Sequence, residues 1–176
     1  MLRHNSQYPP FILDIEASGL SEQSYPIEIG FYHSDTQCFC ALIKPAVHWE
    51  YWSTEAESLH GLTRDIITRR GQSTRDVAKE LNALLQGKTV FSDGWAVDST
   101  WFKKLFYDAR IEPSFWLSAI ETVMTESMID IWDQTKKEVI AELNIPRHRA
   151  STDAKIIQTT WLRAYSRTSK PEKLPA

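Results

Sequence analysis

The sequence predicts an α/β fold in which helices flank a mixed central β-sheet. Three short apolar segments with strand-forming residues follow one another near the start, at residues 11–15, 27–33 and 37–43. Segments with a helical spacing of apolar residues, interrupted by further short strands, come after them. This order is typical of a three-layer domain whose sheet contains antiparallel and parallel strand pairs.

The composition predicts one globular domain. The chain has 176 residues, of which 42% are hydrophobic and 24% are charged, a balance that globular proteins share. We expect a single domain over residues 1–176, with its core at about 11–165 and a flexible tail at 166–176. The net charge of −3 argues against a protein that coats duplex nucleic acid.

For the first half of the chain the sequence predicts a β-hairpin followed by three helices. Ser34-Asp35-Thr36 is short enough to join the second and third strands as a hairpin. Helices are expected at 53–59 and 62–70, with Thr54 or Thr63 as caps. Apolar residues at helical spacing predict a further helix at 73–86, which Gly87 ends.

The second half alternates strands and helices. We expect a strand at 88–92, a helix at about 99–109 and, as the weaker of two choices, a strand at 115–123. Helices are expected at 133–143 and 151–165, the latter with Ser151 as its N-cap. The sequence contains no internal repeat and no linker that would divide it.

Two acidic residues on the first strand are the first sign of a functional site. Asp14 and Glu16 are two residues apart, so their side chains point to the same face of the strand. Carboxylates on an otherwise apolar strand are costly to bury. Close carboxylates repel one another unless a positive charge lies between them, and a divalent cation meets that need.

Three further residues extend the acidic set. Asp98 comes after the predicted strand at 88–92, where α/β sheets gather their sites, although it could also cap the next helix, and Asp93 competes with it as a ligand. His148 and Asp153 are five apart, so they converge only if His148 lies in a loop before the helix. Pro146 favours that loop, and a histidine beside a metal site can accept a proton near neutral pH.

In this order the residues resemble the motifs of the DEDDh 3′–5′ exonucleases. This family of the ribonuclease H-like superfamily contains RNase T, oligoribonuclease and the proofreading epsilon subunit of the bacterial replicative DNA polymerase. The matching segments are Asp14–Leu20, Pro26–Gly30, His60–Thr63 and His148–Ala154. The middle motif, usually His-Asn-x-x-Phe-Asp, reads Asp-Gly-Trp-Ala-Val-Asp here and retains only the acid. The DEDDy branch carries tyrosine where this chain has Arg149.

The resemblance implies a ribonuclease H-like fold and a 3′–5′ exonuclease that hydrolyses phosphodiester bonds at single-stranded 3′ ends of DNA or RNA. Nucleoside 5′-monophosphates would be the products. It also implies a two-metal site with Mg²⁺ or Mn²⁺ and His148 as the general base. The implied metal ligands are Asp14, Glu16, Asp98 and Asp153. The implied substrate contacts are Ser18, Gly19, Leu20, His60 and Phe102.

One alternative from another functional class remains at this stage. The altered middle motif would suit an exonuclease-like fold that binds nucleic acid or a partner protein without cutting, although all five catalytic positions are filled. DNA and RNA are not distinguished, and the aromatic content leaves room for a homodimer. Of two basic clusters, the one formed by Arg147, Arg149 and Lys155 brackets the last motif and is expected to contact phosphate.

The remaining features concern the cellular compartment. Cys38 and Cys40 are too constrained for an ordinary disulfide and are expected to be small buried hydrophobic residues in a reducing compartment. The first ten residues lack the apolar segment of a signal peptide, and no apolar stretch is long enough to cross a membrane. We therefore expect a cytoplasmic protein that does not bind membranes.

Overall fold

A five-stranded mixed sheet forms the centre of the computed structural model, which describes residues 9–169. The strand order is β3-β2-β1-β4-β5. Strands β1, β2 and β3 pair in antiparallel, whereas β4 and β5 extend the sheet in parallel with β1. The strands are β1 (Phe11–Ala17), β2 (Pro26–Ser34), β3 (Gln37–Leu42), β4 (Thr89–Ser92) and β5 (Trp116–Ala119). The predicted α/β fold with a mixed sheet is confirmed.

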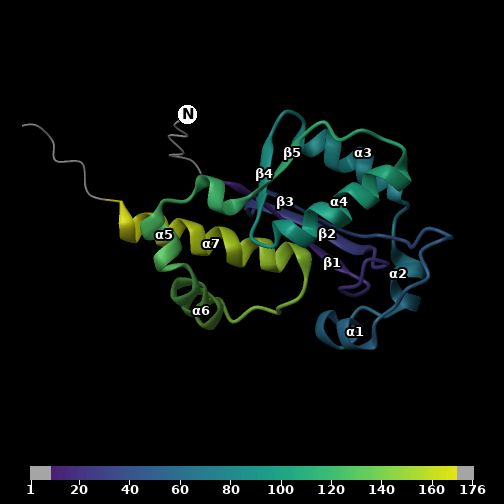
Figure 1. Cartoon of the computed structure of the whole chain (residues 1–176), viewed down its shortest axis with the longest axis horizontal. Coiled ribbons are helices and arrows are strands. Elements are labelled where there is room, and N and C mark those ends of the chain that lie inside the picture. The colour runs from purple at the N-terminus through teal and green to yellow at the C-terminus, as the bar shows by residue number, and fades with distance from the viewer. Residues whose placement is uncertain (1–8, 170–176) are drawn as a thin grey trace, which may run out of the picture.

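Helices cover both faces of this sheet. Figure 1 shows α6 and α7 on one side of it and α3 and α4 on the other. The helices are α1 (Thr54–His60), α2 (Arg64–Arg70), α3 (Thr74–Leu85), α4 (Trp95–Ala109), the 3₁₀ helix η1 (Ile120–Val123), α5 (Glu126–Asp130), α6 (Trp132–Leu143) and α7 (Ala150–Thr168). Within residues 9–169, none of the helices has both the length and the apolar character that a membrane span requires.

Local capping explains where the helices of the first half begin and end. Helices α1, α2 and α3 each start after a residue whose side chain accepts a hydrogen bond from the backbone N–H three positions later. The predicted cap Thr63 is one of them, whereas α1 is capped by Ser53 rather than by Thr54. Helix α3 ends just before Gly87, whose φ of 71° suits the left-handed region, as predicted.

The alternation of side chains along β1 separates two apolar cores. Leu13 and Ile15 belong to the larger core between the sheet and helices α3 and α4. Ile12 belongs to the smaller core, which includes Ile157 and Trp161 of α7. Because side chains two residues apart share a face, the residues at positions 14 and 16 lie on the α7 side.

Gly30 on β2 determines how closely α7 approaches the sheet. It is paired with Asp14 across the β1–β2 ladder. A Cβ atom at this position would lie 2.6 Å from the backbone nitrogen of Ser151, much closer than atoms can pack. The glycine therefore lets the first turn of α7 contact the sheet directly beside Asp14.

Several element boundaries differ from the prediction. Helix α4 begins at Trp95, four residues early, and the segment 115–123 is a four-residue strand followed by η1. Helix α5 was not predicted. The N-cap position of α7 is Arg149, so the expectation for Ser151 is wrong. Helix α7 continues to Thr168, which contradicts a tail that starts at 166, whereas 170–176 lie outside the described residues.

The two cysteines are also placed differently. Cys38 and Cys40 are exposed rather than buried, because they lie on β3, the edge strand of the sheet. The expectation that they are small core residues is therefore wrong. Residues 1–8, which hold most of the segment judged for a signal peptide, lie outside the described residues.

Candidate active site

Strand β1 carries two of the acidic side chains into a partly buried position beside α7. Asp14 and Glu16 are both partly shielded from solvent. Their cross-strand partners on β2 are Gly30 and Glu28. The glycine leaves room for the start of α7, so the two carboxylates lie between the sheet and the loop that precedes this helix.

The third acid, Asp98, lies in the first turn of α4 and is only 3% exposed. The hydroxyl of Ser92, at the end of β4, donates a hydrogen bond to Asp98 Oδ2, and the backbone N–H of Gly94 donates to the same hydroxyl at 3.0 Å. The N-cap position of α4 is Gly94. Asp98 therefore does not cap the helix, and the turn after β4 fixes its carboxylate.

His148 and Asp153 are brought together by the loop before α7. His148 precedes the helix with a φ of 60°, and Asp153 lies in the first turn. The backbone N–H of His148 donates to Asp153 Oδ2 at 2.8 Å, while Arg147 Nε donates to Asp153 Oδ1 at 2.8 Å. This is the arrangement that the five-residue spacing requires for the two side chains to converge.

Residues from distant parts of the chain meet at this point. Glu16, His148 and Asp153 each place one potential ligand atom within 4.8 Å of the other two. The carboxylates of Asp98, Glu16 and Asp153 also lie close enough to Asp14 to raise its pKa. All five residues that the sequence nominated thus lie in one cluster.

Burial and the proximity of other acids both disfavour the ionised forms of three carboxylates in this cluster. Burial, followed by the charges of Asp98 and Glu16, raises the pKa of Asp14 well above its usual value. Burial and the charge of Asp153 raise the pKa of Glu16 to about 7. Burial raises the pKa of Asp98 to about 7, although the Ser92 hydrogen bond opposes that rise. A divalent cation would relieve this repulsion.

The chemistry of the donor set fits a divalent metal. Carboxylate oxygens are the preferred ligands of Mg²⁺ and Mn²⁺, and an imidazole nitrogen suits borderline metals. Asp93, which competed with Asp98 as a ligand, instead forms an ion pair with Lys136 of α6. Its charge still contributes to the raised pKa of Asp98.

A pocket of about 120 Å³ opens next to the acidic cluster. Glu16 and His148 form one wall. His60 forms part of another, with its Nδ1 accepting a hydrogen bond from the Leu62 N–H at 3.0 Å. The proton of the neutral ring is therefore on Nε2, which is buried and has no hydrogen-bond partner in the described part of the chain. The other residues around the pocket are Ile15, Ala17, Gly19, Leu20, Ala56, Leu59 and Trp101.

Three of the predicted substrate contacts line this pocket, and two do not. Gly19, Leu20 and His60 line it, and Leu20 is 86% exposed. Ser18 is fully buried, and its hydroxyl accepts a hydrogen bond from the Tyr25 N–H at 3.1 Å, so it supports the turn after β1. Phe102 is 7% exposed and belongs to the larger core, so the structure does not bring it to the pocket.

Gly19 is required by packing within the chain as well. A Cβ atom there would lie 2.7 Å from the ring carbon Cε1 of Tyr51 and 3.0 Å from Cβ of Ser53. The segment before α1 therefore packs directly against the backbone of Gly19.

Two pocket residues, Trp101 and Leu59, lie outside the predicted substrate contacts. Trp101 lines the pocket in place of its neighbour Phe102. It lies three residues after Asp98, a spacing that puts both on adjoining positions of a helix, so this signal was present in the sequence. Leu59, near the end of α1, lies next to His60 on the pocket wall, and no motif indicates it.

The basic cluster around the last motif forms ion pairs within the protein. Arg147 pairs with Asp153, Arg149 with Glu28, and Lys155 with Asp35. Their position around the last motif predicts contact with phosphate. In the structure their charges instead compensate acidic groups of this chain.

No protein-family model matches this sequence, and no curated protein does either. Solved structures do match. Exonuclease I of Methylocaldum szegediense has a TM-score of 0.67 at 14% identity over 91% of this chain and 40% of its own. E. coli Exonuclease I in complex with a dA16 oligonucleotide has a TM-score of 0.68 at 12% identity over 92% of this chain and 42% of its own.

The chain therefore shares its fold with these Exonuclease I structures. A zinc-ion-bound E. coli Exonuclease I–single-stranded DNA complex has the same fold, with a TM-score of 0.66 at 13% identity over 92% of this chain and 41% of its own. This chain thus spans about two fifths of the length of these structures. At such low identity the likeness establishes the fold alone.

Proposed function

We propose that this protein is a metal-dependent 3′–5′ exonuclease of the DEDDh type that acts on single-stranded ends. The observation that carries the proposal is the convergence of Glu16, His148 and Asp153 beside Asp14 and Asp98, next to a pocket. The motif resemblance and the likeness to Exonuclease I, one example of which holds an oligonucleotide, support the same activity.

In this proposal Asp14, Glu16, Asp98 and Asp153 hold two Mg²⁺ or Mn²⁺ ions. Bound divalent ions lower the pKa of water and neutralise charge on the departing 3′ oxygen. The zinc-bound Exonuclease I complex supports divalent-metal binding by this fold. His148 accepts the proton of the attacking water, and its loop position lets the ring reach the space between Glu16 and Asp153.

The pocket beside the acids receives the terminal nucleotide. Its buried His60 Nε2–H is a donor without a partner among residues 9–169, so a substrate oxygen would satisfy it. Leu20 and Trp101 supply apolar surface for the base or sugar. The catalytic unit in this proposal covers about residues 11–165.

Digestion of 5′-labelled single-stranded DNA and RNA oligonucleotides tests this function. Reactions contain Mg²⁺, Mn²⁺ or EDTA, and the variant Asp14→Ala is compared with Asp133→Ala, which changes an exposed acid on α6. We expect a metal-dependent ladder that shortens from the 3′ end, is lost in Asp14→Ala and persists in Asp133→Ala. Oligonucleotide binding without cleavage in the wild-type protein would instead identify a non-catalytic binding module.

A further inference from the structure

Helix α4 carries an exposed stripe that starts at the candidate active site. Its side chains are exposed and follow one another at intervals of four, three, four and three residues, which places them on one side of the helix. The residues of this α4 stripe are Ala96, Thr100, Lys103 and Tyr107 of the helix and Arg110, the C-cap residue that follows it.

The beginning of the stripe is continuous with the active-site pocket. Ala96 and Thr100 line a second hollow together with Leu20 and Trp101. Leu20 and Trp101 also line the pocket that contains Glu16. A molecule held at the acidic cluster can therefore continue over Leu20 onto α4.

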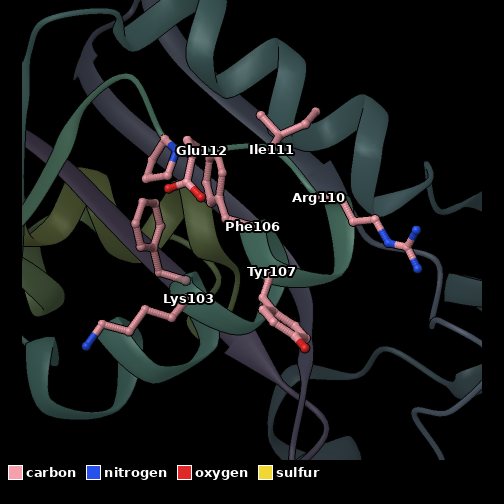
Figure 2. Close-up of a pocket in the computed structure, with 8 residues that line it drawn as sticks. Lys103, Phe106, Tyr107, Arg110, Ile111 and Glu112 are labelled. Atoms are coloured by element: carbon pink, nitrogen blue, oxygen red, sulfur yellow. The ribbon is translucent and has the colours of Figure 1, made fainter.

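The end of the stripe borders a pocket of about 480 Å³. Phe102 and Phe106 form its apolar floor, and the segment from Ile111 to Pro113 forms the opposite wall. In Figure 2, Phe106 lies next to Glu112, and Lys103, Tyr107 and Arg110 follow one another along the helix. A volume of this size is typical of sites for small organic groups.

The end of α4 builds this wall. Arg110 has a φ of 53°, and its backbone N–H bonds to the carbonyl groups of Phe106 and Tyr107. Its left-handed conformation is uncommon for a residue other than glycine or asparagine. The chain therefore reverses at Arg110 and returns Ile111 to the side of the pocket opposite Phe102 and Phe106.

The pocket is lined by two cations, Lys103 and Arg110, and one acid, Glu112, so its lining has a net positive charge that suits an anion with a flat apolar group. Within residues 9–169, neither Lys103 nor Arg110 forms an ion pair, whereas Lys104 donates to the Ser24 carbonyl at 2.7 Å. Tyr107 is 86% exposed between these two cations. Exposed aromatic rings that alternate with basic groups are how proteins hold single-stranded nucleic acid.

We propose that the α4 stripe and the pocket at its end bind the single-stranded part of the substrate several nucleotides from its 3′ terminus. This inference rests on the proposed exonuclease function. From Asp98 to Arg110 the helix rises by about 18 Å, which corresponds to about five nucleotides at about 3.4 Å per stacked nucleotide. A dinucleotide at the acidic cluster cannot reach Tyr107 or Arg110, whereas a 12-mer can.

The test compares kcat/KM for a 12-nucleotide single strand and for a dinucleotide. Tyr107→Ala should lower kcat/KM for the 12-mer about tenfold, mainly through KM, because stacking of one base contributes about 1–3 kcal/mol. Tyr107→Phe keeps the ring and should retain most of the activity. In the double variant Lys103→Ala and Arg110→Ala, the slope of log K for 12-mer binding against log salt concentration should become shallower by about 1.4. Each lost phosphate contact accounts for about 0.7 of that change. Lys137→Ala, an exposed lysine of α6, is the charge control.

Loss of activity on both substrates to the same degree, or no loss on the 12-mer, would overturn the proposal. Binding of a fluorescent 12-mer to the same variants without metal gives a second measurement that needs no cleavage. If the wild-type protein binds the 12-mer through Tyr107 but does not cut it, the exonuclease function fails and the binding stripe stands. If a Glu-Glu-Glu-Phe peptide binds at Arg110 and the 12-mer does not, the pocket receives a protein partner instead.

Discussion

Arg149 and Glu28 form an ion pair that ties the start of α7 to strand β2. Arg149 Nη2 lies 2.6 Å from Glu28 Oε1, and the backbone N–H of Ala150 donates to Glu28 Oε2 at 2.9 Å. Glu28 is fully buried and sits opposite Glu16 in the β1–β2 ladder. The pair therefore holds the loop of His148 over the acidic strand, and the charge of Arg149 lowers the pKa of Glu16.

Removing Arg149 should destabilise the protein. Breaking a fully buried ion pair costs about 3–5 kcal/mol. The Arg149 side chain is 42% exposed, so solvent screens its charge, and we expect the free energy of unfolding to fall by about 2 kcal/mol in Arg149→Ala. Arg149→Lys keeps the charge but not the two-point contact, so its loss should be smaller. Urea unfolding measures both, with Arg70→Ala, an exposed arginine of α2, as the control. Equal stability of Arg149→Ala and the wild type would show that the pair is dispensable.

The raised pKa values predict how the stability of the metal-free protein depends on pH. The pKa values of Glu16 and Asp98 rise from 4.5 and 3.8 to about 7 on folding. Between these values the folded state binds more protons than the unfolded state, so stability falls as pH rises toward about 7. We expect a lower Tm in EDTA at about pH 8 than at about pH 5. His60, whose pKa burial lowers from 6.5, acts in the opposite direction at low pH.

The variant Asp98→Asn separates the contribution of Asp98 to this pH dependence from that of Glu16. The amide cannot ionise, so the fall in Tm between about pH 5 and about pH 8 should be smaller than in the wild type. Added Mn²⁺ should raise the Tm of the wild type more at about pH 8, where the carboxylates are ionised, than at about pH 5. A Tm that increases steadily over this range in EDTA would contradict the crowding of acids at the site.

Arg147 is expected to compete with a metal ion for Asp153. Its Nε lies 2.8 Å from Asp153 Oδ1, so one carboxylate oxygen already has a cationic partner. A partly exposed ion pair contributes about 0.2–1 kcal/mol, so Arg147→Gln should tighten Mn²⁺ binding up to about fivefold. Isothermal titration calorimetry measures this, with Lys155→Gln, whose pair with Asp35 is more exposed, as the control. Weaker Mn²⁺ binding in Arg147→Gln would assign Arg147 a supporting role instead.

The sequence predicted those features of the fold and site that depend on local geometry. The period of a strand places Asp14 and Glu16 on one face, and Pro146 keeps His148 outside α7. The sequence does not predict that Arg149 pairs with Glu28, because the two residues are 121 positions apart and only the tertiary fold brings them together. Whether Phe102 or Trp101 lines the pocket depends on the rotation of α4 about its axis, because successive residues of a helix point about 100° apart. Both side chains belong to the larger core, at 8% and 7% exposed, so hydrophobicity alone did not reveal that Trp101 also lines the pocket beside the acids.

His148→Asn distinguishes a proton acceptor from a metal ligand at this position. Asparagine tolerates the φ of 60° that His148 adopts better than alanine does, so the loop and its bond to Asp153 should persist. If His148 is the general base, cleavage should slow by about 10²–10⁴-fold while Mn²⁺ affinity stays within about twofold. If His148 instead binds metal together with Glu16 and Asp153, Mn²⁺ affinity should fall in parallel with activity. Calorimetry and single-turnover cleavage on the same preparation decide between these roles, and an active His148→Asn protein would exclude both.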